Sequence, residues 1–195
     1  SCGHYFEAPN DIDLSGVVNL EDVKTRFRDA FVMIDSVERQ RTILDAAQEL
    51  ASSKLCKVNE AQLGNYLEEI AGLVEWPSLL MGQIEDQFMV LPDELLQCTI
   101  ETHQKYITLT EADGSFSKYF ILLSNRLPDI ERDRVIISGN QRVLRARLAD
   151  AEFFWKEDQA RGIEAYLPKL ANVTFHEGLG NLYDKAFRIE ALSTM

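Results

Sequence analysis

A two-residue step, Asp113-Gly114, constrains the fold of this chain more than any other feature. It lies between two runs rich in β-branched and aromatic residues, Tyr106–Thr110 and Ser117–Ser124. An Asp-Gly pair favours the tight turns that join antiparallel strands, because glycine adopts a positive φ without steric cost. The sequence therefore predicts a β-hairpin at about 106–124 with Asp113 and Gly114 at its tip.

Apolar residues at intervals of three and four predict several helices around this hairpin. Asn19, Asp35 and Asn59 have the position and side chain of helix caps. Asn140 is the predicted cap of a long helix at about 141–161, in which the residues expected to face inward are Val143, Leu144, Leu148, Ala151 and Trp155. The other predicted helices span 20–29 and 37–52, run from 59 to about 73, and begin at Pro92 and at Leu182.

Short β-prone runs predict further strands at 3–6, 31–34, 88–91, 135–137 and 173–175. Strands and helices alternate along the chain, but the clearest pairing is a hairpin. We therefore expect an α+β fold with a mainly antiparallel or mixed sheet and several packed helices, not a doubly wound parallel sheet. The predicted division is an α+β domain over 1–138 and a helical segment over 139–195.

Charge and cysteine content limit the classes of protein that fit. The chain has 20 Lys and Arg against 32 Asp and Glu, a net charge of −12, which opposes a free-standing nucleic-acid binder. Three separated cysteines without a C-x-x-C pair fit a reducing cytoplasm, and no apolar run is long enough for a membrane span. The chain begins without methionine and ends inside a helical pattern, so we expect both ends to be cut points.

Motifs for catalysis or metal binding are weak. No glycine-rich phosphate loop is present, and no two of the three histidines share a helical face. Asp150, Glu152 and Asp158 resemble an acidic metal group, but they point to different sides of one predicted helix. The aromatic residues that could stack on bases are better explained as core: Trp76, Phe153, Phe154 and Trp155. We therefore predict no catalytic residue and no metal site.

The best candidate for binding an anion is a basic segment of the chain. Between Lys105 and Arg147, eight basic residues outnumber five acidic ones, although the whole chain is acidic. Arg142 and Arg145 share a helical face, Arg147 lies at its flank, and Asn140 would leave the helix N-terminus open to a phosphate. These four residues and Lys105 form the predicted phosphate-contact set. The alternative is that the arginines pair with Asp150, Glu152 or an acidic partner protein.

Several sequence blocks, in order along the whole chain, resemble the β subunit of bacterial heterotetrameric glycyl-tRNA synthetase. Short blocks precede residue 130: Gly3-His4-Tyr5-Phe6, Glu75-Trp76-Pro77, Gly82, Leu91-Pro92-Asp93-Glu94, His103-Gln104-Lys105-Tyr106 and Ser124-Asn125. The densest block runs from Gly139 to Phe154, and it is followed by Asp158, Leu179-Gly180 and Asp184-Lys185. The resemblance covers an internal portion of a longer subunit and ends where a region related to the HD superfamily begins.

This resemblance implies an α2β2 class II synthetase that charges tRNA with glycine in the cytoplasm. Its α subunit would hold ATP, magnesium and glycine, and this fragment would hold no cofactor. The fragment would be a noncatalytic portion of the β subunit that supports tRNA binding and assembly, with the α subunit, tRNA(Gly) and the rest of the β subunit as partners. The alternative is an interaction module that holds subunits or domains together without touching tRNA.

Overall fold

The computed structural model describes residues 2–8, 10–64 and 66–194. It divides into two compact units, Ser1–Ala149 and Asp150–Met195. Helix α6 (Ile130–Arg161) contains the boundary between these units and also the boundary predicted at 138/139.

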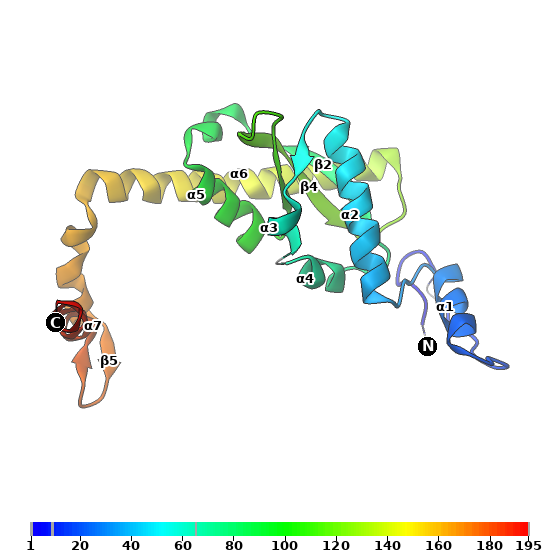
Figure 1. Cartoon of the computed structure of the whole chain (residues 1–195), viewed down its shortest axis with the longest axis horizontal. Coiled ribbons are helices and arrows are strands. Elements are labelled where there is room, and N and C mark those ends of the chain that lie inside the picture. The colour runs from blue at the N-terminus through cyan, green and yellow to red at the C-terminus, as the bar shows by residue number, and fades with distance from the viewer. Residues whose placement is uncertain (1, 9, 65, 195) are drawn as a thin grey trace. The chain divides into compact units, whose positions relative to one another are not determined.

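The first unit contains a four-stranded antiparallel sheet in the order β1-β3-β4-β2, of which Figure 1 labels the neighbouring strands β2 and β4. The strands are β1 (Lys57–Val58), β2 (Ser78–Gln83), β3 (Ile107–Thr110) and β4 (Phe116–Ser124). β3 and β4 form the predicted hairpin, in which Gly114 has φ 89° and the Asp113 carboxylate accepts a hydrogen bond from the backbone N–H of Ser115 at 3.0 Å. The predicted hairpin and the α+β class with an antiparallel sheet are confirmed.

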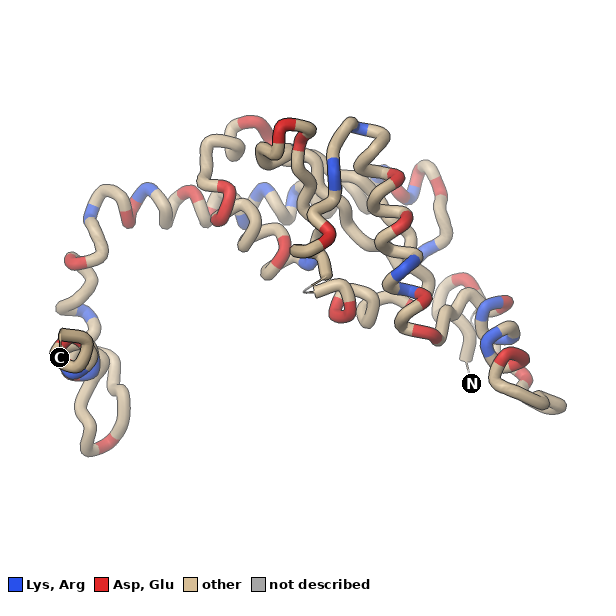
Figure 2. The backbone as a smooth tube through the Cα atoms, in the orientation of Figure 1, with Lys and Arg blue, Asp and Glu red and all other residues tan. Residues whose placement is uncertain are grey.

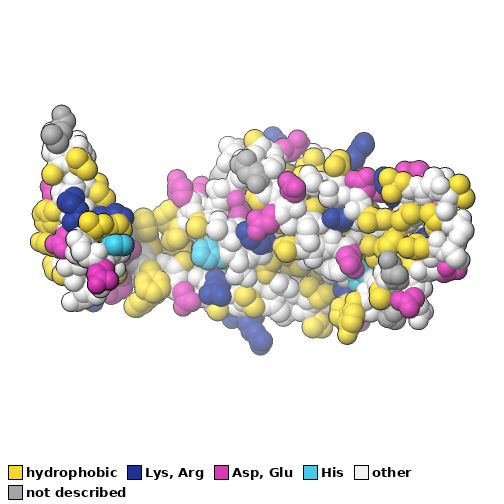
Figure 3. Space-filling view, turned by 90° about the horizontal axis from the view of Figure 1, so that it is seen from below, with side chains coloured by type: hydrophobic (Ala, Val, Ile, Leu, Met, Phe, Trp, Pro, Cys, Tyr) yellow, Lys and Arg dark blue, Asp and Glu magenta, His cyan; other side chains and the backbone are white. Residues whose placement is uncertain are grey.

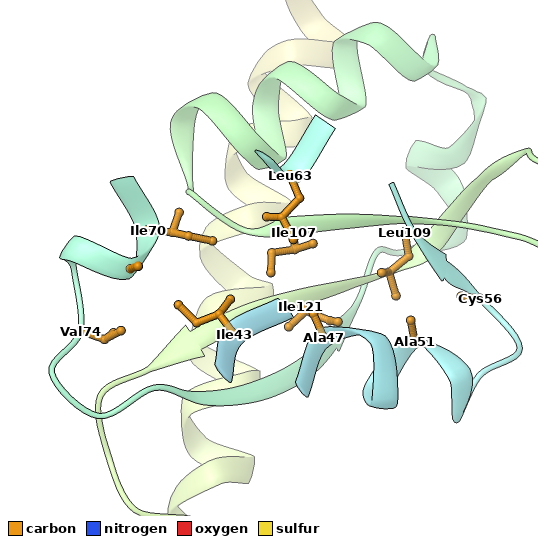
Figure 4. Close-up of a cluster of buried hydrophobic side chains, with 11 residues drawn as sticks. Ile43, Ala47, Ala51, Cys56, Leu63, Ile70, Val74, Ile107, Leu109 and Ile121 are labelled. Atoms are coloured by element: carbon orange, nitrogen blue, oxygen red, sulfur yellow. The ribbon is translucent and has the colours of Figure 1, made fainter. Parts of the chain in front are cut away.

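Side chains alternate between the two faces of this sheet along each strand, and each face contributes apolar side chains to a core cluster. One face carries Ile107, Leu109 and Ile121 into a first core cluster, which is completed by α2 (Ser36–Ser52), α3 (Glu60–Gly64) and α4 (Leu67–Gly72) (Figure 4). The opposite face belongs to a second cluster. Its members include Leu80, Phe120 and Leu122 from the sheet, Leu96 from α5 (Asp93–Gln97), Ile100 from the π-helix η2 (Cys98–His103), and Leu144 and Leu148 from α6.

The predicted helix caps at the start of the chain are confirmed. The side chain of Asn19 accepts from the N–H of Asp22 at the start of α1 (Leu20–Asp29). Asp35 accepts from the N–H of Val37 at 3.0 Å and of Glu38 at 3.3 Å at the start of α2. Each cap satisfies backbone donors that the first helical turn leaves free.

Several strand predictions are wrong. Residues 3–6 and 31–34 form no strand, and Phe31 has a positive φ of 56° that interrupts any extended run. Residues 88–91 lie in or next to the 3-10 helix η1 (Asp86–Val90). The run 135–137 belongs to α6, because that helix begins at Ile130 and not at residue 141, so the β-branched side chains of Ile136 and Ile137 pack from a helix against the second cluster.

The predicted helix from 59 to 73 is also interrupted. Asn59 caps it as expected, accepting from the N–H of Gln62 at 3.2 Å. α3 then ends at Gly64 and α4 begins at Leu67, while residue 65 lies outside the described residues.

The second unit contains the end of α6, the 3-10 helix η3 (Ile163–Asn172), a short β5–β6 pair (Thr174–His176 and Gly180–Asn181) and α7 (Leu182–Ser193). The strand predicted near 173–175 and the last helix are confirmed, and a capping box between Asn181 and Asp184 begins α7. None of the described residues from 150 to 194 is buried. Trp155 and Val143, both predicted to face inward, are 38% and 47% exposed.

Candidate functional site

Helix α6 carries the predicted arginines on its exposed surface. Leu144 and Leu148 are each 1% exposed and fix the helix against the second core cluster, so the residues between them project outward. Figure 2 shows Lys and Arg interspersed with Asp and Glu along α6. The basic window of the sequence therefore does not fold into a uniformly basic face.

Arg142 and Arg145 lie against different surface features. The Nε atom of Arg145 is 3.0 Å from Glu85 Oε1, and both side chains are about half exposed. Arg142 lines a shallow groove of about 400 Å³ with Arg134, Ser138 and Gly139. The predicted alternative, a structural pair, thus describes Arg145, although the carboxylate comes from Glu85.

Two other members of the predicted set differ in their surroundings. Lys105 Nζ lies 2.8 Å from Glu69 Oε1, in an exposed pair of the kind that contributes little to stability. Arg147 is exposed, and among the residues described neither Arg147 nor Arg142 forms an ion pair. Arg142 and Arg147 are therefore the two predicted cations left facing solvent.

Asn140 does not begin a helix, and the prediction of an open N-terminus there is wrong. α6 begins ten residues earlier, where the Asp129 carboxylate accepts from the backbone N–H of Arg132 at 2.8 Å. Asn140 instead accepts a hydrogen bond from the Tyr106 hydroxyl at 2.6 Å and donates to the carbonyl of Ile136 at 2.7 Å. Its role here is to join α6 to the segment before β3, and an acidic cap occupies the true helix start.

A buried carboxylate that sequence reasoning missed lies in the π-helix η2. Glu101 is 9% exposed and accepts hydrogen bonds from Gln62, at 2.8 Å to each oxygen, from Gln97 at 3.2 Å and from the Thr108 hydroxyl. Its donors come from three separate elements, so nothing local in the sequence signals the cluster. With both oxygens occupied, Glu101 stabilises the junction of α3, η2 and β3.

The Gly-His-Tyr-Phe block near the start of the chain is also structural. A Cβ on Gly3 would lie 2.4 Å from the carbonyl oxygen of Ala8, and buried His4 accepts from the backbone N–H groups of Phe6 and Glu7 through Nδ1. Glu7 Oε1 lies 2.8 Å from Arg126 Nε, which holds the pKa of Glu7 below its usual range. This block ties the beginning of the chain to the segment that precedes α6.

The second unit exposes many of its large apolar side chains. Its large exposed side chains include Phe153 and Phe154, at 60% and 62%, and Leu192 at 71%. Figure 3 shows hydrophobic side chains at its surface, at the left end of the view. The interpretation of Phe153, Phe154 and Trp155 as core residues is wrong for this chain by itself, because nothing within the unit covers them.

A protein-family model described as "Glycyl-tRNA synthetase beta subunit" matches residues 1–195. The chain belongs to the glycyl-tRNA synthetase β subunit family. It is 40% identical over 191 residues to the glycine–tRNA ligase β subunit of Rhodospirillum centenum, a match that covers 98% of this chain and 26% of that protein. The corresponding subunits of Rickettsia felis and Cereibacter sphaeroides are 38% and 41% identical over 188 and 197 residues. These matches cover 96% and 98% of this chain and 27% of each relative, so it spans about a quarter of their length.

Among the described residues, no three His, Cys, Asp or Glu side chains gather in a way that could hold a metal ion. In the same part of the chain, no helix combines the length and apolar character that crossing a bilayer requires.

Proposed function

We propose that this chain is a noncatalytic part of the β subunit of a cytoplasmic glycine–tRNA ligase and that it supports assembly of the enzyme. The α subunit would hold the ATP, magnesium and glycine of the reaction, and tRNA(Gly) would be the shared substrate. Residues 139–195 would lead into the HD-related region of the subunit. Family membership over the whole chain supports this proposal.

The proposed assembly role rests mainly on one observation. None of the described residues of the second unit is buried. A folded unit is stabilised mainly by apolar burial, at roughly 25 cal/mol per Å². The end of α6, η3, α7 and two short β-strands, with Phe153, Phe154 and Leu192 in solvent, lack this stabilisation by themselves. We infer that polypeptide from the rest of the enzyme covers these side chains.

A paired substitution tests this role. Phe153→Ser with Phe154→Ser is expected to lower the melting temperature of the complete β subunit, because covering one such side chain contributes about 1.5–3 kcal/mol. The same pair is expected to leave the isolated chain nearly unchanged, since both rings are exposed there. Lys156→Ser is the matched control, because Lys156 lies on the same helix and is 67% exposed. Equal melting temperatures for the double variant and the unsubstituted complete subunit would contradict the assembly role.

Direct contact with tRNA is a second proposed function, favoured by the exposure of Arg142 and Arg147. Removing a cation that binds a phosphate should reduce the slope of log affinity against log salt by about 0.7–0.9. Arg142→Ala with Arg147→Ala is therefore expected to give a shallower slope in tRNA binding by the complete enzyme. Lys105→Ala is the control, since Lys105 already pairs with Glu69. An unchanged slope would favour an interaction module that makes no tRNA contact.

The noncatalytic character has its own assay. The purified chain, free of α subunit, is expected to give no glycine-dependent exchange of pyrophosphate into ATP. Exchange at a rate above that of a heat-denatured sample would refute this part of the proposal.

A further inference from the structure

Strand β2 lies at one end of the sheet, where only β4 pairs with it. It has six residues, Ser78–Gln83, whereas β1 at the opposite end of the sheet has two. An edge strand presents unpaired backbone groups along its outer side, and proteins usually protect such an edge with charged residues, proline, a bulge or a covering element.

The register shows which backbone groups of β2 point outward. The N–H of Ile84 donates to the carbonyl of Lys118 at 2.8 Å, and the same register pairs Gly82 with Phe120. Hydrogen-bonded residues alternate along an antiparallel pair, so Leu80 and Gly82 turn their backbone groups toward β4. Leu79 and Met81 consequently turn theirs away from the sheet.

Two neighbouring observations agree with this assignment. Gln83 has the same parity as Met81, and its carbonyl accepts a hydrogen bond from Gln141 Nε2 of α6 at 3.0 Å, which a group facing β4 would not do. Pro77 also has this parity, and a proline is tolerated where its missing N–H would face outward. The side chain of Gln141 thus covers the carbonyl at the far end of the edge, and Pro77 lies just before the other end.

Leu79 and Met81 between them offer two N–H and two C=O groups. Within the described part of the chain, neither forms a hydrogen bond to a group outside the sheet. No charged residue and no proline occurs between Ser78 and Gln83, so the strand itself carries none of the usual protection.

A groove of about 450 Å³ lies beside the start of this edge. Its lining is mainly apolar and comes from α2, from the residues that enter β2 and from the segment before α6: Leu50, Trp76, Pro77, Leu79 and Pro128. Glu49 lies at the same groove. In an added strand, every second side chain would point to this side of the sheet.

We propose that β2 accepts an additional strand, supplied by an extended segment of the longer β subunit outside the span of this chain. The inference rests on the assembly role proposed above and gives that role a specific site. The segment would pair its backbone with Leu79 and Met81, place apolar side chains at alternate positions in the groove and carry a basic residue near Glu49. Main-chain hydrogen bonds provide affinity in strand addition, and the pockets beside the strand provide specificity.

Two observations select this occupant. The chain covers 26% to 28% of its curated relatives, so the longer subunit has ample polypeptide, and its covalent linkage gives the segment a high local concentration. A second copy of this chain would bring together two molecules of net charge −12, which opposes association.

Residue-resolved hydrogen exchange tests the proposal. In the isolated chain the amides of Leu79 and Met81 should exchange quickly, whereas those of Leu80 and Gly82, bonded within the sheet, should be protected. In the complete β subunit the Leu79 and Met81 amides should slow by at least about tenfold, because exchange then requires local opening of the added strand. Equal exchange in both samples overturns the proposal. Protection that rises with the concentration of the isolated chain, or that needs the α subunit, overturns the assigned occupant.

A substitution separates strand addition from general packing. Met81→Pro removes the outward N–H and leaves the ladder to β4 intact, while Met81→Leu keeps the N–H and a similar volume. Relative to Met81→Leu, the proline variant should lower the melting temperature more in the complete subunit than in the isolated chain, and equal effects in both overturn the proposal. If Phe153→Ser with Phe154→Ser destabilises the complete subunit while Leu79 and Met81 stay unprotected, strand addition fails and the assembly role stands.

Discussion

Replacing Gly82 with alanine should destabilise the first unit, because the Phe120 ring of β4 occupies the space that a side chain at this position would need. Gly82 lies directly opposite Phe120, and a Cβ there would meet three atoms of the Phe120 ring at 2.3, 2.8 and 2.9 Å. The ring is fully buried and stacks on Tyr106, with centroids 5.1 Å apart and planes 18° apart. It therefore has no free space into which to move.

The expected cost follows from overpacking. Forcing an extra methyl group into a packed core costs about 1–3 kcal/mol, and the lower backbone entropy of alanine in the unfolded chain offsets roughly 0.4–1 kcal/mol of this. A domain of 150–250 residues loses about 2–4 °C of melting temperature per kcal/mol. We expect Gly82→Ala to unfold several degrees below the unsubstituted chain in thermal and urea denaturation.

Two further variants make the prediction specific. Gly139→Ala is the matched control, because Gly139 lies in α6 and, outside the adjoining backbone of this helix, no described atom comes within 4 Å of its added Cβ. This substitution should stabilise the chain by about 0.4–1 kcal/mol. Phe120→Leu should partly rescue Gly82→Ala, with a coupling of about 0.5–3 kcal/mol between the two sites. Unchanged or raised stability in Gly82→Ala, or strictly additive effects in the double variant, would refute the proposed close contact.

Three other outcomes follow from single contacts. The ionised Glu7 carboxylate should contribute fully to the free energy of unfolding above its ordinary pKa of 4.5, and this contribution should be lost as the pH falls through its lowered pKa. Glu7→Gln should lack this part of the acid unfolding. Identical profiles of stability against pH for the two proteins would contradict the role of the Arg126 pair. Tyr106→Phe should cost about 0.5–1.5 kcal/mol in urea unfolding, because Asn140 loses its hydroxyl donor, and an equally stable variant would show that this bond contributes nothing. Burial raises the pKa of the Cys56 thiol, so iodoacetamide should label the two exposed cysteines well before Cys56 in a mass-spectrometric time course, and equal rates would place Cys56 at the surface.

The local sequence was sufficient to predict the helices and the turn that depend on one characteristic residue, such as a cap or a glycine. Asn19 and Asp35 cap the first two helices, and Asp113 and Gly114 form the turn of the hairpin. These features depend on side chains that bond to the backbone within three residues or on one permissive φ, so a short window contains the whole cause. The antiparallel character of the sheet followed from the hairpin.

The sequence did not reveal β2, and it assigned 135–137 to the wrong kind of element. β2 is flanked by core on both faces, so it lacks the alternation of apolar and polar residues that marks a half-exposed strand. Ile136 and Ile137 are β-branched and favour strands when taken alone, but the helix that begins at Ile130 places them against the second cluster. Burial against distant residues overrode local propensity at this site.

The sequence by itself determined the family, the caps at Asn19, Asp35 and Asn59, and the hairpin, whereas only the tertiary structure decided what the candidate residues contact. Glu7 meets Arg126 across 119 positions, and Arg145 meets Glu85 of the segment that follows β2, pairings that no local spacing encodes. Asn140 has the residue type of a cap and became a bridge to Tyr106, because α6 starts earlier than its own apolar pattern suggests. A cap or a turn can be predicted from a few neighbouring residues. The ion-pair partner of a charged side chain, and the residues that cover an apolar face, depend instead on which distant segments the core brings together.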